Sequence, residues 1–243
     1  MVAELWNAAR SAGGIFQPPD LAGIPEPARR YLDHAIAPGT SVATAVRLRM
    51  HGEIRLGRWL PFTAEQTIDA ARGFEWQATV RFGAVPMFRG FDRLLDGVGE
   101  MRWKLLGLIP VVTAKGPDVT RSAIGRFTAE SIWLPSVLVR DVSWFAPDSE
   151  HLTATFRGSQ NAHSVELTID PSGRVESLGV YRWGNPGGGP FRLEKFGGVI
   201  EAERTFSGFT IPSRVRVGWY FGSPRFESEG EFFRATIHDA IFS

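Results

Sequence analysis

The stretch AVRLRMHGEIRLG, residues 45–57, alternates apolar and polar side chains along most of its length. Val46, Leu48 and Met50 stand at every second position, and Arg47 and Arg49 lie between them. This period of two is typical of a long β-strand that buries one face and exposes the other. The stretch therefore predicts a sheet with one apolar face.

The same alternation recurs in many later segments. They are residues 60–68, 74–82 and 101–105, then HLTATFR (151–157), HSVELTID (163–170), RVESLGVYRW (174–183), GVIEAERTF (198–206), SRVRVGWYFG (213–222) and EGEFFRATI (229–237). The helices that a doubly wound parallel fold requires between its strands are missing from the pattern. We therefore expect an α+β protein, mostly β, with a single strongly curved antiparallel sheet or an open β-barrel.

Two segments have helical patterns. In EPARRYLDHAIAPG (26–39), Tyr31 and Leu32 fall on one apolar face before a Pro-Gly stop. A central helix is expected over about 118–134, with Asp118 as its N-cap and Pro135 after its end. We expect this helix to plug the open side of the sheet. Residues 1–24 are then an N-terminal extension, and 25–243 form a single curved-sheet domain.

The composition excludes several classes of protein. Aromatic residues make up 12% of the chain, with 8 Trp and 18 Phe, which indicates either a large core or an apolar cavity. A net charge of +1 without a basic run is not typical of a nucleic-acid-binding protein. The absence of cysteine excludes disulfides and thiolate chemistry. Because no apolar stretch reaches the length of a signal-peptide core or a membrane span, we expect no transmembrane segment and a cytoplasmic location.

The central helix carries a column of polar side chains along one edge. Ser122, Arg126, Glu130 and Trp133 follow one another at helical spacing. Packing on the sheet would partly desolvate the carboxylate of Glu130, and Arg126 is its nearest cation. Such a pair can serve as a general base or as an anchor for a ligand head group. The alternative is a structural ion pair that orients the helix, which is the commoner case.

Several residues are candidates for the wall of a cavity. Tryptophan suits such a wall because its ring is apolar while its N–H needs a polar partner. The expected ligand-binding residues are Trp76, Phe82, Trp103, Arg126, Glu130, Trp133 and Trp183. Further polar candidates are Glu65, Asp92 and Arg121. For any single tryptophan, an ordinary core position is the alternative.

The standard catalytic and cofactor motifs are absent from the sequence. It has no G-x-S-x-G elbow, no P-loop and no H-E-x-x-H motif. DGVGEMR (96–102) places Arg102 where a dinucleotide-binding loop needs its third glycine. The five histidines are scattered over separate segments. We therefore expect no cofactor and no metal site, and Glu130 is the single catalytic candidate.

Six motifs together resemble an uncharacterised bacterial family that is known only as a domain of unknown function. They are IPEPARRYLDHAI (24–36), RLRMHGEIRLGRWLPFTAEQ (47–66), GEMRWKLLGLIPVV (99–112), RSAIGRFTAESIWLPS (121–136), YRWG (181–184) and GEFFRATI (230–237). The resemblance covers the chain from about residue 24 to its end. It implies no catalytic residues, because none are assigned in the family.

The order of elements also resembles, more distantly, the periplasmic lipoprotein-carrier fold, which is LolA/LolB-like. That fold combines an N-terminal helix, a long curved antiparallel sheet and a helical insertion that plugs the open side. The resemblance implies a concave apolar face able to take an acyl chain, with the central helix as a lid. The sequence departs from those carriers in lacking an export signal and a lipidation cysteine.

Three functions remain open at this point. The first is binding of a hydrophobic or amphipathic, lipid-like small molecule in the cavity of the curved sheet. The second is a cofactor-independent enzyme that acts on a hydrophobic substrate in the same cavity, with Glu130 as acid or base. The third is a protein-interaction module that uses an open sheet edge or an apolar patch.

Overall fold

One sheet of thirteen strands dominates the computed structural model, which describes residues 5–6, 13–17, 21, 23–140, 142–157 and 163–243. The strands are β1 (Ala45–Leu56), β2 (Arg58–Asp69), β3 (Gly73–Phe82), β4 (Val85–Leu95), β5 (Val98–Leu105), β6 (Ile109–Lys115), β7 (Val142–Phe145), β8 (His151–Phe156), β9 (Ser164–Ile169), β10 (Val175–Gly184), β11 (Arg192–Phe206), β12 (Phe209–Trp219) and β13 (Glu231–Phe242). The helical elements are α2 (Glu26–Ala35), α3 (Pro117–Ala129), α4 (Val137–Arg140), the 3-10 turn η2 (Glu130–Trp133) and the π-helical turn η3 (Phe226–Gly230).

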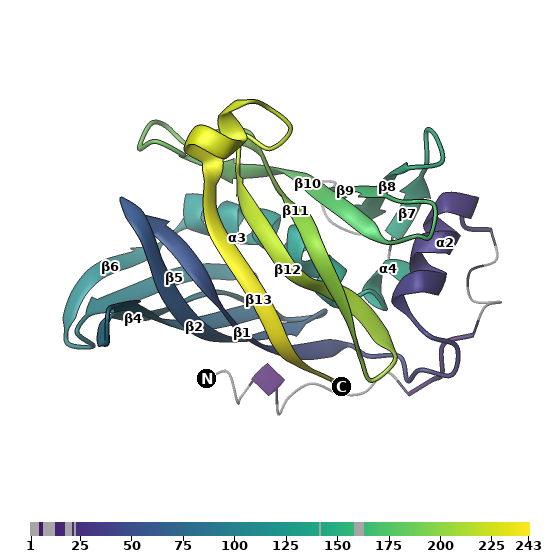
Figure 1. Ribbon diagram of the computed structural model, residues 1–243, viewed down its shortest axis with the longest axis horizontal. Helices are drawn as coiled ribbons and strands as arrows, with labels where there is room; N and C mark the ends of the chain where they lie inside the picture. Colours follow the sequence, from purple (N-terminus) through teal and green to yellow (C-terminus); the bar gives the residue numbers. More distant parts are fainter. Residues whose placement is uncertain (1–4, 7–12, 18–20, 22, 141, 158–162) are drawn as a thin grey trace.

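The first and last strands of the chain meet in the middle of the sheet (Figure 1). Its strand order is β6-β5-β4-β3-β2-β1-β13-β12-β11-β10-β9-β8-β7. Every neighbouring pair is antiparallel. The strands β6 and β7 are the two edges and do not pair with each other, so the sheet is not closed into a barrel. The predicted fold class, mostly β with one antiparallel sheet and an N-terminal and a central helix, is confirmed.

The alternation in β1 sorts its side chains between the two faces of the sheet. Val46, Leu48 and Met50 are buried, whereas Arg49 and His51 are exposed. The neighbouring strands have the same alternation, because paired residues on adjacent antiparallel strands point to the same face of the sheet. Leu48, for example, lies between the buried Gln66 of β2 and the buried Ala240 of β13. One face is consequently apolar, and the other carries most of the charged side chains.

The helix α3 lies across the open side of the apolar face. It packs against β10 in one half of the sheet and against β4 and β5 in the other. These strands stand far apart in the strand order, so the sheet must curve around the helix to contact it from both sides. Figure 1 shows α3 behind β12 and β13 in this view. The prediction that a central helix plugs the open side of the sheet is confirmed.

The N-cap predicted for this helix is wrong. The helix begins at Pro117, and the N-cap residue is Gly116 with a φ of 126°, a conformation that glycine adopts without strain. Pro117 needs no hydrogen-bond partner in the first turn because it has no N–H. Asp118 therefore lies inside the helix, and its carboxylate instead accepts a 2.7 Å hydrogen bond from Nε1 of Trp183.

One cluster of buried side chains extends from the N-terminal segment to the sheet and α3. The helix α2 buries Tyr31 and Leu32, as its pattern predicts. Phe16 and Leu21 belong to the same cluster, although they precede α2. Parts of residues 1–24 lie outside the described residues, and the division of the chain near residue 24 stays a prediction.

Gly99 of β5 allows α3 to approach the sheet closely. A Cβ at this position would lie 2.6 Å from Cα of Thr120 and 2.8 Å from the carbonyl oxygen of Val119. We expect Gly99→Ala to lower the free energy of unfolding by about 1–3 kcal/mol, because the helix backbone has to move away. The matched control is Gly14→Ala, since a Cβ on Gly14 meets no atom within 4 Å. Urea unfolding of both variants measures the difference, and equal effects would contradict the close approach.

Candidate functional site

A cavity of about 250 Å³ lies between α3, η2 and the apolar face of the sheet. Most of its wall is apolar and comes from β1, β10, β11, β12, β13 and η2. The apolar lining residues on these elements are Ile54, Leu178, Phe196, Val215, Val217, Trp219, Phe232, Phe233, Ile132 and Trp133. The volume exceeds the roughly 150 Å³ that suffices to bind benzene in an engineered protein cavity. The space is therefore large enough for a small apolar molecule or a short alkyl chain.

One side of the cavity carries a cluster of polar side chains from five separate elements. They are Gln66 of β2, Asp92 of β4, Arg126 and Glu130 at the end of α3 and the start of η2, and Arg182 of β10. Two positive and two negative formal charges therefore meet beside an apolar space. Charges in such surroundings persist only when they are paired or hydrogen-bonded, so the partner of each group determines what the cluster can do.

Arg126 is the centre of this cluster. Its Nε donates to Oε1 of Glu130 at 2.7 Å, and its Nη1 donates to Oδ2 of Asp92 at 3.1 Å. The guanidinium also lies over the rings of Phe74 and Trp76, at 4.6 and 5.3 Å from their centroids. Burial works to lower the pKa of Arg126, but Glu130 and Asp92 outweigh it and the pKa is raised. Arg126 therefore remains charged and is engaged by the protein itself.

Both carboxylates of the cluster have a second donor. Nε2 of Gln66 donates to Oε2 of Glu130 at 2.6 Å, and Nε1 of Trp103 donates to Oδ1 of Asp92 at 2.9 Å. Burial raises the pKa of Glu130, and the Arg126 guanidinium opposes that rise. Both oxygens of each carboxylate thus accept a hydrogen bond from the protein.

Arg182 differs from Arg126 because no carboxylate pairs with it. Its Nε donates to the carbonyl oxygen of Ser122 at 3.0 Å. Its guanidinium lies over the rings of Phe196 and Trp219, at 4.6 and 5.0 Å from their centroids. Burial, followed by repulsion from Arg126, lowers the pKa of Arg182 to about 9. Among the described residues, none accepts a hydrogen bond from its two terminal nitrogens.

The structure brings five of the predicted site residues together. Trp76, Asp92, Arg126, Glu130 and Trp133 all line the cavity. Trp103 lies directly behind this wall, where its ring packs on Trp76 with 5.7 Å between the ring centroids.

Four predicted residues, Phe82, Trp183, Arg121 and Glu65, lie outside this cavity. Phe82, at the end of β3, is 44% exposed and packs under Arg58. Trp183 follows Arg182 on β10 but does not line the cavity, and its ring stacks with Arg121 of α3 at 3.7 Å. Glu65 lies on the outer face of the sheet, where it pairs with Arg49 at 2.9 Å.

The sequence reasoning missed Gln66 and Arg182, although strand periodicity contains a signal for both. Gln66 stands in register with the buried Ala64 and Ile68 of β2. Arg182 follows the buried Val180 at the next inward-facing position of β10. A polar residue at an apolar position of a regular strand is the pattern that would have identified both side chains.

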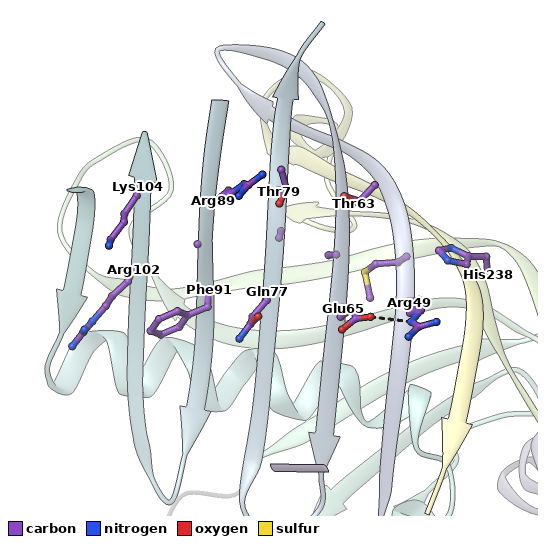
Figure 2. Close-up of a pocket in the computed structure, with 14 residues that line it drawn as sticks. Arg49, Thr63, Glu65, Gln77, Thr79, Arg89, Phe91, Arg102, Lys104 and His238 are labelled. Carbon is purple, nitrogen blue, oxygen red and sulfur yellow. Dashed lines mark hydrogen bonds and ion pairs between the residues drawn. The ribbon is translucent and has the colours of Figure 1, made fainter. Parts of the chain in front are cut away.

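Two further hollows adjoin the sheet. One, of about 130 Å³, shares Asp92, Arg126 and Arg182 with the apolar cavity and is otherwise lined by residues such as Phe191 and Asn185. The other is an open groove of about 800 Å³ on the outer face of the sheet. Figure 2 shows that long polar side chains from neighbouring strands, including Glu65, surround this groove. We take the apolar cavity as the candidate site because it combines an enclosed apolar wall with convergent charged groups.

No metal site is evident in the part of the chain that the structure describes, where no group of three His, Asp or Glu side chains is placed to hold an ion. None of the helices described is both long enough and apolar enough to cross a membrane.

Residues 14–228 match the model of DUF6544, a family of unknown function. The chain belongs to the DUF6544 family. This match confirms the family resemblance seen in the sequence motifs. No curated protein matches the sequence of this DUF6544 member.

Solved structures share the fold of this DUF6544 protein at low sequence identity. A DUF1329 family protein from Desulfovibrio piger has a TM-score of 0.47 and 11% identity, with 89% of this chain and 92% of that chain covered. A LolA superfamily protein from Nitrosomonas europaea has a TM-score of 0.45, 11% identity and the same coverage of each chain. A domain from Vibrio parahaemolyticus named for outer membrane lipoprotein sorting has a TM-score of 0.44 and 8% identity, with 82% and 85% covered. These values describe a distant likeness to this group of structures.

The predicted cytoplasmic location is wrong by the same comparison. The similar structures include a LolA superfamily protein and a domain named for outer membrane lipoprotein sorting, and these names do not support a cytoplasmic location. The prediction rested on the lack of an apolar stretch of signal-peptide length, and that observation does not determine the compartment.

We expect Arg126→Met to lower the free energy of unfolding by about 3–5 kcal/mol, because it leaves the buried Glu130 and the half-buried Asp92 without their cation. The matched control is Arg72→Met. Arg72 pairs with Asp96 at 2.8 Å on the surface, where loss of an ion pair has little effect on stability. Urea unfolding at neutral pH measures both values. A loss no greater for Arg126→Met than for Arg72→Met would mean that the buried pair is not what holds α3 in place.

The raised pKa of Glu130 predicts a pH dependence of stability. The folded protein binds more protons than the unfolded chain between the ordinary glutamate pKa and the raised value, so the free energy of unfolding falls as pH rises through that interval. We expect Glu130→Gln to remove this fall, and Glu65→Gln, on the outer face, to keep it. Unfolding measured from about pH 4 to pH 8 tests the difference. Parallel pH profiles for wild type and Glu130→Gln would exclude a titration of Glu130 in this range.

Proposed function

We propose that this protein binds a hydrophobic or amphipathic small molecule in the cavity between α3 and the sheet. The observation that carries the proposal is an enclosed apolar wall with charged side chains along one side. Small-molecule sites are usually concave and mostly apolar, with a few polar groups that fix the orientation of the ligand. The cavity has this composition, because aliphatic and aromatic side chains surround the Arg126 cluster.

The position of the cavity also supports a binding role. Its wall draws on strands from both halves of the sheet, and α3 and η2 close it from the other side. Trp133 of η2 is held against β12, because its Nε1 donates a hydrogen bond to the carbonyl oxygen of Pro212 at 3.1 Å. The indole N–H of Trp76, which also lines the cavity, has no acceptor among the described residues. An apolar ligand with a polar end fits these surroundings.

Catalysis by Glu130 is less favoured than binding. A general acid or base must reach the reacting group directly or through one water. Both oxygens of Glu130 already accept hydrogen bonds from Arg126 and Gln66. The same contacts suit a carboxylate that holds Arg126 and η2 in place, which is a structural contribution to the site.

We expect the neutral fluorophore N-phenyl-1-naphthylamine to bind the cavity and to gain fluorescence there. Val217→Phe should weaken this binding by about tenfold or more, because the larger ring occupies space that the ligand needs. Val98→Phe, at an exposed position 44% accessible to solvent, is the matched control. Fluorescence titration measures the affinities, and a thermal melt of each variant verifies that it folds. Absence of binding to wild type, or equal binding to both variants, would contradict the proposal.

A further inference from the structure

The guanidinium of Arg182 is the one group of the polar cluster whose partner is missing from the described chain. Arg126 donates to both carboxylates of the cluster, and Gln66 and Trp103 supply their second donors. Arg182 makes a hydrogen bond through Nε alone. The guanidinium group of an arginine carries five N–H donors in one plane. Donors that are shielded from water and have no acceptor lower the stability of the folded protein.

We propose that the two terminal nitrogens of Arg182 bind the carboxylate of an amphipathic ligand whose alkyl chain lies in the apolar cavity. This inference rests on the binding function proposed above and names the ligand class. Guanidinium and carboxylate groups match in shape and charge, and they form two parallel hydrogen bonds. The ligand is accordingly a monocarboxylic acid of fatty-acid type.

The protein holds Arg182 in a fixed orientation before any ligand binds. The carbonyl oxygen of Ser122 holds Nε, and the rings of Phe196 and Trp219 contact the guanidinium plane. Gly125 of α3 leaves space for this side chain, because a Cβ there would lie 2.9 Å from Cγ of Arg182. A side chain that is already ordered loses little conformational entropy on binding.

Arg182 lies between two hollows, which could hold the alkyl chain and the carboxylate of such a ligand separately. Arg182 lines both the apolar cavity and the adjoining 130 Å³ hollow, so it lies where the two meet. The alkyl chain would contact residues such as Val217 and Phe233, while the carboxylate faces the guanidinium beside the hollow.

The electrostatics of the cluster agree with this assignment. Four charged groups interact in it, namely Arg182, Arg126, Asp92 and Glu130. Burial, followed by the positive charge of Arg126, lowers the pKa of Arg182 to about 9, and the carboxylates of Glu130 and Asp92 oppose this shift without cancelling it. A ligand anion in direct contact would favour the charged form of Arg182.

Competition against N-phenyl-1-naphthylamine tests the inference with two ligands that differ in the head group alone, decanoate and decanol. We expect wild type to bind decanoate at least about tenfold more tightly than decanol at neutral pH. Arg182→Met should reduce this ratio to about one, and Arg182→Lys should keep part of it. Glu130→Gln should increase the ratio, because it removes a nearby negative charge. Arg121→Met, at an exposed arginine that stacks on Trp183, is the matched control and should keep the wild-type ratio.

The outcomes separate this inference from the proposed function. Binding of the fluorophore and of decanol without a preference for decanoate would overturn the role of Arg182 and leave the cavity intact as a binding site. A preference that survives in Arg182→Met, in a variant that still binds decanol, would also overturn it. Failure of the fluorophore and of both ligands to bind would refute the proposed function itself. Absence of a preference for decanoate in wild type overturns the inference even where a variant does not fold, and Arg182→Lys is the second variant where Arg182→Met does not fold.

Discussion

The apolar face of a thirteen-stranded sheet has to be covered, and this constraint shapes the rest of the molecule. A flat sheet of this width would expose far more apolar surface than one helix of thirteen residues can bury. The sheet therefore curves, so that β4 and β5 from one half and β10 from the other contact the same helix. The pairing of β1 with β13 makes this possible, because it joins the two halves into one surface. Gly99 then determines how closely α3 can approach that surface.

The cavity follows from the same constraint. The helix α3 ends at Ala129 and continues as the single turn η2, and the cavity lies between these two elements and strands that include β12 and β13. Side chains of the sheet do not fill the remaining space, and the buried ion pair of Arg126 with Glu130 lies at its side. A buried ion pair contributes little to net stability, since the cost of removing both charges from water offsets their attraction. The ion pair instead determines where its residues lie. Through the hydrogen bond from Gln66 to Glu130 it holds η2 against β2, and it places charged groups at one side of an apolar cavity.

Regular patterns in the sequence determine much of this fold. The alternation in β1 predicts which of its side chains are buried, and helical spacing predicts that Arg126 and Glu130 pair, as they do at 2.7 Å. Patterns of this kind work because they depend on local geometry alone. The failures depend on contacts between distant segments. Phe82 and Trp183 have the composition expected of a cavity wall, but strand ends and strand orientation place them outside it. The start of α3 was misplaced because the helix begins at Pro117, after Gly116, so that Asp118 lies within its first turn.

The charge balance of the cluster constrains what the cavity can hold. Arg126 and Arg182 are formally balanced by Asp92 and Glu130, so an added anion would leave one negative charge in excess. Burial already raises the pKa of Glu130, which makes this carboxyl the group in the cluster that takes up a proton most easily. Binding of a carboxylate next to Arg182 would raise that pKa further, because like charges disfavour each other's ionised form. A proton taken up by Glu130 would reduce this excess charge. In the proposed site, Arg182 contacts the head group of the ligand, and Glu130 influences the charge around it.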